Sequence, residues 1–276
     1  MGLRISTNIA SEMVQKNLKD VSKDETKSLE RLSSGSRINS ASDDAAGLAI
    51  ATKLKAETTS MRQATRNAND GISFVQSAEG GLGEVSNILI RLRELGIQSA
   101  SDTVGSEERQ FMDLEYQQLT AEVDRIASST KFNGKDLLNG EGDGVLDFHI
   151  GTNANEENTI QFDTSTTNAT SSNLGISGTG VMEKGDALGS LSSIDEAINQ
   201  VSGQRANLGA IQGRLQTSVN NLENQTVNLE QARSVIQDAD VASESSKLAS
   251  ASIVKSAGIS TLSQANGLSR SALKLV

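Results

Sequence analysis

Residues that could perform chemistry are few in this sequence. The only histidine, His149, lies in the alternating stretch VLDFHI, and a lone histidine without an oriented acid or base beside it is typical of a strand surface. The stretch GEGDG, which ends at Gly144, lacks the spaced oxygen ligands of a calcium loop. Because the chain has no cysteine, it has no thiol chemistry and no thiolate metal ligand. We therefore expect no metal site and no cofactor.

One charged cluster has the side chains of a catalytic site. It lies in the stretch RLSSGSRINSASDDAAGLAIA and contains Arg31, Arg37, Asp43 and Asp44. A Ser/Gly/Asn segment between two helix-like segments marks a joint, and the aspartates can cap the helix that follows. The chain also lacks a P-loop, a Gly-x-Ser-x-Gly motif and a dinucleotide fingerprint. We interpret the cluster as a cap and ion-pair network, and we predict that the protein is not an enzyme.

The composition limits the classes of partner. The 276 residues have a net charge of −10, whereas nucleic-acid binding needs clustered Lys and Arg. No apolar run approaches the roughly 20 residues of a membrane span, and the N-terminal stretch lacks the apolar core of a cleaved secretory signal. Neither nucleic acid nor membrane is therefore expected as a partner. Aromatic residues make up 2% of the chain, so the core must be mostly aliphatic.

Apolar spacings of three and four residues predict long helices. The first covers about 6–33, and a second helix or helix pair runs from the joint to about residue 101. The second carries a seam of Met61, Ala64, Ala68, Ile72, Val75, Ala78, Leu82, Val85, Leu89 and Leu92. Gly80, Gly81 and Gly83 weaken this prediction locally. A third helix is expected over 107–129, with inward residues Phe111, Leu114, Leu119, Val123 and Ile126.

The C-terminal third carries the most regular pattern. Seven aliphatic residues recur every seventh position, at Ile194, Val201, Leu208, Leu215, Leu222, Leu229 and Ile236. Such a repeat is typical of a coiled-coil seam, and a helix over these residues would be about 60 Å long. A last helix is expected over 241–276. The first and last helices each carry an apolar stripe, formed by Ile5, Ile9, Met13, Leu18 and Val21 and by Leu262, Leu268 and Leu275.

The middle of the chain differs in composition. Residues 141–190 hold eight acidic residues and one basic residue, and so contribute −7 of the net charge. The stretches VLDFHI and NTIQF alternate as short strands do, and Asn133-Gly134 and Asn139-Gly140 are turn pairs. We expect a small, solvated, acidic β-rich excursion, and we expect residues 153–180 to be dispensable for assembly.

These elements define the predicted architecture. The fold class is mainly α, a long coiled-coil rod with paired N- and C-terminal helices and a small β-rich excursion in the middle. The predicted boundaries give a first domain of 1–44 with 237–276, a rod domain of 45–140 with 190–236, and a variable region of 141–189. Ser33, Ser34, Gly35 and Asn39 are the candidate connector residues between the first two.

Several stretches together resemble bacterial flagellin. SLERLSSGSRINSASDDAAGLAIA, NANDGISFVQSAEGGLGEV, IRLRELGIQSA and STKFNGKDLLNG are similar to its N-terminal region, and QDADVASESSKL and ISTLSQANGLSRSALKLV to its C-terminal region. The resemblance covers about residues 1–140 and 190–276. Several features depart from the family pattern, among them the two that follow. Val235 replaces a usual Arg, and the short middle leaves no room for large outer domains.

The resemblance implies a function. A flagellin is the subunit of the extracellular flagellar filament, so the expected partners are other flagellin subunits, the flagellar export apparatus, a secretion chaperone and the filament cap. The paired terminal helices would form the inner filament core. The assembly residues implied there are the eight stripe residues named above, and Ser33, Ser34, Gly35 and Asn39 would form the connector.

The resemblance also implies a candidate receptor surface. Arg91, Leu95 and Glu115 match flagellin positions that contribute to recognition by Toll-like receptor 5. Two other functions stay open at this point. A hook–filament junction protein of the same superfamily would share the two ends, and a cytoplasmic coiled-coil adaptor would share the heptads.

Overall fold

The computed structural model describes residues 8–141 and 144–273, and it is mainly α, as predicted. The described chain forms two compact units, which we call unit 1 (residues up to 58 and from 227) and unit 2 (residues 59–226). The helices are α1 (Ile9–Ser34), α2 (Ala45–Ser99), α3 (Ser106–Ser129), α4 (Lys184–Gln237) and α5 (Val241–Leu273). No helix in the described part of the chain is both long and apolar enough to cross a membrane.

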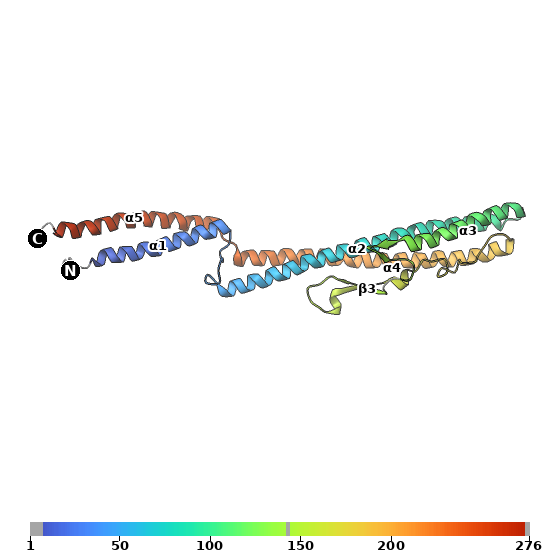
Figure 1. Ribbon diagram of the computed structural model, residues 1–276, viewed down its shortest axis with the longest axis horizontal. Coiled ribbons are helices and arrows are strands. Elements are labelled where there is room, and N and C mark those ends of the chain that lie inside the picture. The colour runs from blue at the N-terminus through green and yellow to red at the C-terminus, as the bar shows by residue number, and fades with distance from the viewer. Residues whose placement is uncertain (1–7, 142–143, 274–276) are drawn as a thin grey trace. The chain divides into compact units, whose positions relative to one another are not determined.

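Unit 1 is built on an antiparallel pair of helices, α1 and α5 (Figure 1). Three contacts set its register. Asn8 Nδ2 donates to Ala265 O at 3.1 Å, Lys255 Nζ lies 2.6 Å from Glu25 Oε2, and Ser28 Oγ donates to Glu244 Oε2 at 3.1 Å. The paired terminal helices of the predicted fold are therefore confirmed.

Unit 2 holds the main hydrophobic core, between α2, α3 and α4. The predicted α2 seam is buried throughout, apart from a half-buried Ile72, and the α4 heptad positions from Ile194 to Leu222 are buried as well. The glycines at 80, 81 and 83 do not interrupt α2. A Cβ at Gly81 would lie 2.6 Å from Leu138 Cδ1 and 2.8 Å from Thr130 Oγ1, so glycine there allows the 130–138 segment to pack closely on the helix.

The predicted inward face of α3 is wrong in part. Val123 is buried, and Leu119 and Ile126 pack against the core, but Phe111 and Leu114 are 71% and 63% exposed. The buried stripe consists of Met112, Tyr116, Thr120, Val123 and Ala127. The helix has apolar residues on two faces. Tyr116 can occupy the core position because its hydroxyl has a hydrogen-bond partner there, Thr179 Oγ1 at 2.7 Å.

Two small antiparallel hairpins follow α3. In the first, β1 (Lys131–Phe132) pairs with β2 (Lys135–Asp136) through Asn133 and Gly134, which both have positive φ. In the second, β3 (Val145–His149) pairs with β4 (Thr159–Asp163), which confirms the two predicted strands. Short 3-10 turns lie at Glu156–Asn158 and Thr164–Thr167.

The expectation that the middle of the chain is solvated is wrong. Phe74 of α2 makes edge-to-face contacts with the rings of Phe132, Phe148 and Phe162, at centroid distances of 5.5, 5.6 and 5.0 Å. Four of the five phenylalanines of the chain thus meet where the two hairpins pack on α2. Edge-to-face pairs add to the stabilisation from burial. The second hairpin is therefore part of the core of unit 2.

The segment after β4 is also held down, by acidic side chains of α3. Asp124 accepts hydrogen bonds from Ser171 N and Ser171 Oγ at 2.8 and 2.7 Å, and Asp113 accepts one from Val181 N at 2.8 Å. Between these points, Leu174 and Ile176 are buried. Carboxylates that accept from backbone N–H groups make strong hydrogen bonds, so this segment is fixed although it has no regular secondary structure.

The α4 seam gives a first stability prediction. Leu215 is fully buried, and replacing it by alanine should lower the free energy of unfolding by about 2–5 kcal/mol, because transfer and cavity costs add. Asn221→Ala is the matched control on the same helix: its side chain is exposed and is bonded only to Gln225, so we expect a change within about 0.5 kcal/mol. Thermal unfolding followed by circular dichroism measures both. Equal shifts would show that the seam does not stabilise the subunit.

Candidate functional site

The candidate site is the joint of unit 1, where the chain leaves α1 and where it enters α5. Helix α1 ends at Ser34, and Gly35 follows with φ of +69°, a left-handed conformation that favours glycine. The two connecting segments then pair as a single antiparallel bridge between Ser36 and Asp238. Arg37 N donates to Gln237 O at 2.7 Å, and Ala239 N donates to Gly35 O at 2.9 Å.

Arg37 also caps the end of α4. Its Nη2 and Nε donate to Ile236 O at 2.6 and 3.3 Å. A cation at a helix C-terminus satisfies carbonyl groups that have no partner within the helix and interacts favourably with the helix dipole. The first connector thus holds the end of a helix that lies about 200 residues later in the sequence.

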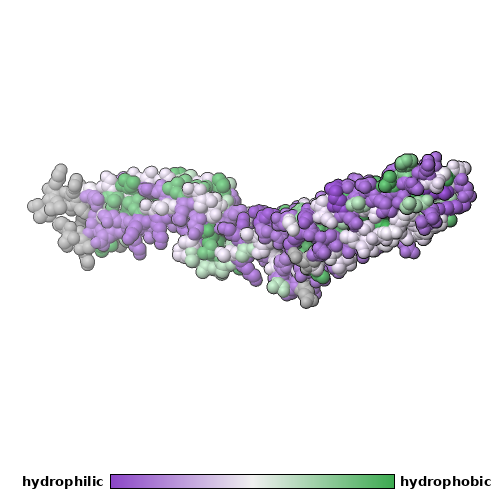
Figure 2. All heavy atoms as spheres, turned by 45° about the vertical axis from the view of Figure 1, so that its right-hand side comes forward, coloured by the Kyte–Doolittle hydropathy of each residue, from purple (hydrophilic) through white to green (hydrophobic). Residues whose placement is uncertain are grey.

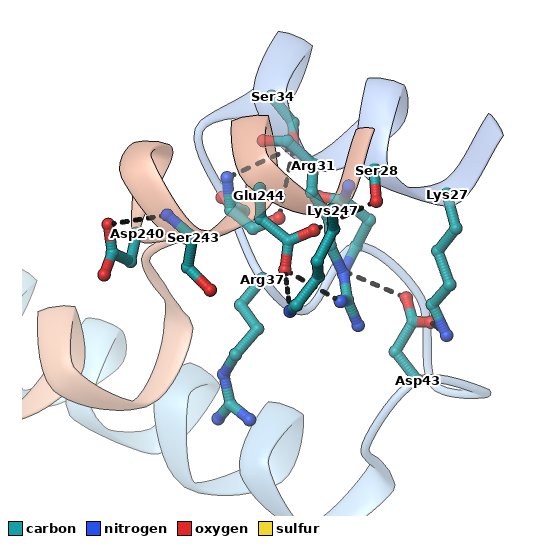
Figure 3. A network of polar contacts seen from close by, with 12 residues as sticks. Lys27, Ser28, Arg31, Ser34, Arg37, Asp43, Asp240, Ser243, Glu244 and Lys247 are labelled. Carbon is teal, nitrogen blue, oxygen red and sulfur yellow. Dashed lines mark hydrogen bonds and ion pairs between the residues drawn. The ribbon is translucent and has the colours of Figure 1, made fainter. Parts of the chain in front are cut away.

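The second feature of the joint is a carboxylate between α1 and α5 (Figure 3). Glu244 is only 4% exposed, and it accepts hydrogen bonds from Ser28 Oγ at 3.1 Å, Arg31 Nη1 at 3.2 Å and Lys247 Nζ at 2.7 Å. Lys247, Ser28 and Arg31 favour the charged form, and they hold the pKa of Glu244 below its usual value although burial opposes this. Glu244 therefore joins the two helices by charge-assisted hydrogen bonds.

Asp43 ties the segment between α1 and α2 to α1 in a similar way. Its carboxylate lies 2.6 Å from Lys27 Nζ and accepts hydrogen bonds from the backbone N–H groups of Asn39 and Ser40 at 3.3 and 3.2 Å. The ammonium group of Lys27 and these N–H groups lower the pKa of Asp43 to about 2. Asp44 caps α2 by accepting from Gly47 N at 2.8 Å. The charged cluster is thus a network of caps and ion pairs.

One further group considered for chemistry lies elsewhere. His149 is exposed on β3, in unit 2, at a distance in the sequence from every residue of the joint. Within residues 8–141 and 144–273, no three His, Asp or Glu side chains gather to hold a metal ion. The arrangement at the joint can fix the helix ends.

The stripe residues fall into two groups. Leu18 and Val21 are half-buried and line a groove of about 260 Å³ against α5, where Leu18 packs on Gly258 so closely that a Cβ there would lie 2.8 Å from its Cδ2. Ile9 and Met13 do not line this groove and are 54% and 63% exposed. Leu262 is half-buried. Ile5 and Leu275 lie outside the described residues, as does the side chain of Leu268.

The three candidate receptor residues are not equally accessible. Arg91 donates to Glu115 Oε1 through Nε and Nη2 at 3.0 and 2.8 Å, and both side chains are about half exposed. Leu95 is 1% exposed and belongs to the core of unit 2, because its position on α2 faces the other helices. A receptor could contact the Arg91–Glu115 pair on this surface but not the Leu95 side chain.

Sequence reasoning missed Glu244 and Gly258. One signal for Glu244 was present, since it is the only acidic residue from 241 to 276. A single carboxylate in a helix otherwise rich in small and apolar residues indicates a specific partner. Its partners on α1 lie more than 210 positions away, so spacing along the chain could not identify them.

The Glu244 network should make the α1–α5 pair sensitive to acid. Because the pKa of Glu244 is lower in the folded chain, its contribution to stability is present above the usual value of 4.5 and is lost as the pH falls through the folded value. Hydrogen exchange should show less protection near residues 28–31 and 244–247 below about pH 4.5. In Glu244→Gln the protection should be weaker at pH 7 and should change little over that range. Equal pH dependence in both proteins would contradict this role.

Comparisons with known proteins agree on one family. The family model of the bacterial flagellin N-terminal helical region matches residues 5–143, and that of the bacterial flagellin C-terminal helical region matches residues 191–276. A flagellin of Halalkalibacterium halodurans is 38% identical over 250 residues, 91% of each chain, and the flagellar filament 33 kDa core protein of Treponema phagedenis is 36% identical over 99% of each. The crystal structure of Bacillus cereus flagellin is similar with a TM-score of 0.51 and 28% identity, over 61% of this chain and 94% of that one.

Proposed function

The chain belongs to the bacterial flagellin family and is a structural subunit of a flagellar filament, and from this premise we propose which of its residues carry assembly. The observation that carries the proposal is that unit 1 buries few apolar side chains. Among its described residues only Ile38, Ala51 and Ala265 are buried apolar side chains, whereas those of unit 2 form a large core. Unit 1 thus has little hydrophobic stabilisation of its own.

The apolar residues that unit 1 leaves exposed are the candidate contacts between subunits. Ile9 and Met13 of α1, with Ile253 and Ile259 of α5, are each more than half exposed, and we call them the assembly faces. Figure 2 shows apolar groups at several places on the otherwise hydrophilic surface of this unit. Ile9 and Met13 are one helical turn apart and so adjoin, and adjoining exposed apolar side chains are typical of a protein–protein contact. In the filament, copies of the same chain would cover it.

The joint is proposed as the connector between filament core and rod. Gly35, the Ser36–Asp238 bridge and the Glu244 and Asp43 networks support this role, because they fix the end of α1 and the start of α5 with directional bonds rather than with a core. Ser33 and Ser34 belong to the last turn of α1, and the backbone of Asn39 bonds to Asp43. The corresponding domain division is 1–44 with 237–276 for the core, 45–140 with 190–236 for the rod and 141–189 for the variable region.

The remaining partners follow from family membership. We propose that the chain is secreted through the flagellar export apparatus with the help of a chaperone, that it is added beneath a filament cap, and that it acts outside the cell as a structural protein and not an enzyme. Recognition by Toll-like receptor 5 would depend on Arg91 and Glu115. The homologues are filament proteins, which favours the filament subunit over the hook–filament junction protein and the coiled-coil adaptor.

A seeded polymerisation assay tests the assembly faces. Ile9→Asn should raise the critical concentration for polymerisation at least severalfold, because a neighbouring subunit would have to bury an amide in place of an apolar group. Lys16→Gln is the control, since it changes an exposed polar residue on the same helix. The monomer melting temperature should be similar in both, because neither side chain is buried. Normal polymerisation of Ile9→Asn would remove this face from the assembly contact.

A further inference from the structure

The five methionines of the chain differ sharply in accessibility. Met61 and Met112 are buried in unit 2, Met182 is 51% exposed in the segment before α4, and Met13 is 63% exposed on α1. Met1 lies outside the described residues. Peroxides oxidise exposed methionine more readily than buried methionine, so Met13 and Met182 are the accessible sites in the described chain.

Met13 differs from Met182 in what surrounds it. Ser11, Val14, Leu18 and Val21 form the side of α1 that faces α5, through bonds to Asn266 and the groove beside Gly258. Met13 lies off that side and follows Ile9 by four positions, so the two share one face of the helix. The Met13 side chain is therefore largely exposed to solvent in the monomer and lies in an assembly face.

We propose that Met13 is an oxidation site that controls polymerisation, an inference that rests on the assembly role proposed above. A peroxide transfers one oxygen atom to the Met13 sulfur: the O–O bond breaks, an S–O bond forms, the sulfur loses two electrons, and hydrogen peroxide is reduced to water. The sulfoxide is polar, and its oxygen is a strong hydrogen-bond acceptor. Burying it against an apolar neighbour without a donor is unfavourable, so oxidised subunits fail to add to the filament.

The same reasoning predicts that assembly protects the residue. In the monomer Met13 meets solvent, whereas in the filament a neighbouring subunit covers it. Subunits already assembled therefore resist peroxide at this position. Reduction of the sulfoxide by a thiol-dependent methionine sulfoxide reductase restores the apolar face and the capacity to assemble.

The test compares critical concentrations before and after treatment of full-length monomer with hydrogen peroxide, and mass spectrometry locates the sulfoxides. For the unaltered chain and for Met182→Leu, the critical concentration should rise about tenfold or more after treatment. For Met13→Leu it should stay close to its own value before treatment. Reductase treatment should return the critical concentration to its value before oxidation. Peptides containing Met13 should also oxidise several times more slowly in filaments than in monomer.

Two results would overturn the proposal. One is an unchanged critical concentration in protein whose Met13 is shown to be oxidised, and the other is an equal rise in Met13→Leu. Either result leaves the assembly role of unit 1 intact if Ile9→Asn still impairs polymerisation. If Ile9→Asn and oxidised Met13 both polymerise normally, the assembly face itself is wrong.

Discussion

Replacing Phe162 by alanine should lower the free energy of unfolding of unit 2 by about 3–5 kcal/mol. The side chain is 1% exposed, and its ring centroid lies 5.0 Å from that of Phe74. The substitution removes a large buried side chain, leaves a cavity and breaks an edge-to-face contact. For a unit of this size the melting temperature should fall by roughly 6–20 °C.

Phe111→Ala is the matched control for Phe162→Ala. It makes the same chemical change at a side chain that is 71% exposed, so the stability should change by no more than about 0.5 kcal/mol. Chemical denaturation of the monomer, followed by circular dichroism, measures both free energies. If Phe162→Ala proved as mild as Phe111→Ala, the hairpin would not belong to the core.

The aromatic cluster also changes what is expected of a deletion. Removing residues 153–180 would take away β4 with Phe162, and with it Leu174 and Ile176 from the core. Composition suggested that this stretch is dispensable, because Ser, Thr and acidic residues are usually solvated. In the structure three of them, Thr164, Thr167 and Ser171, are buried and hydrogen-bonded, as where Thr167 Oγ1 donates to Leu137 O at 2.9 Å. Sequence composition alone does not show such pairings.

The long helices, by contrast, could be predicted from the sequence. The α2 seam and the α4 heptads each bury one continuous face, and a period of three to four residues reports that directly. On α3 the same reasoning failed in part, because Phe111 and Leu114 lie on one apolar face and Met112 and Tyr116 on another. Periodicity identifies apolar faces, but only the tertiary contacts decide which of two faces meets the core.

At the joint, too, some residue roles could be predicted from the sequence and others could not. Asp44 and Gly35 stand next to the helix ends that they cap, and Asp43 binds N–H groups three and four residues before it, so local rules were sufficient to identify them. Glu244 and Gly258 act on α1, which is more than 200 residues away in the sequence. Their roles depend on the register of α1 against α5, which a single sequence does not contain.

Deleting residues 1–40 or residues 240–276 should abolish filament formation and leave unit 2 folded. Each deletion removes one helix of the α1–α5 pair and one assembly face, and neither removes a residue of the unit 2 core. We expect no seeded polymerisation at any accessible concentration, together with a melting transition for unit 2 close to that of the full chain. Filaments built by either truncated chain would contradict the assembly mechanism.

The same helices should be the least stable part of the free monomer. Between α1 and α5 the described contacts are mainly hydrogen bonds, ion pairs and the half-buried side chains of Val14, Leu18 and Val21. In the described part of these two helices, Ala265 is the only buried apolar residue. Isolated helices without a large buried face are marginal in water. Limited proteolysis should therefore cut within residues 1–40 and 240–276 in monomer and spare unit 2, and polymerisation should protect both ends, since neighbouring copies then bury the assembly faces. If both ends resisted protease equally in monomer and in filament, the terminal helices would be stable without assembly, and the ordering of these helices by neighbouring subunits would have to be abandoned.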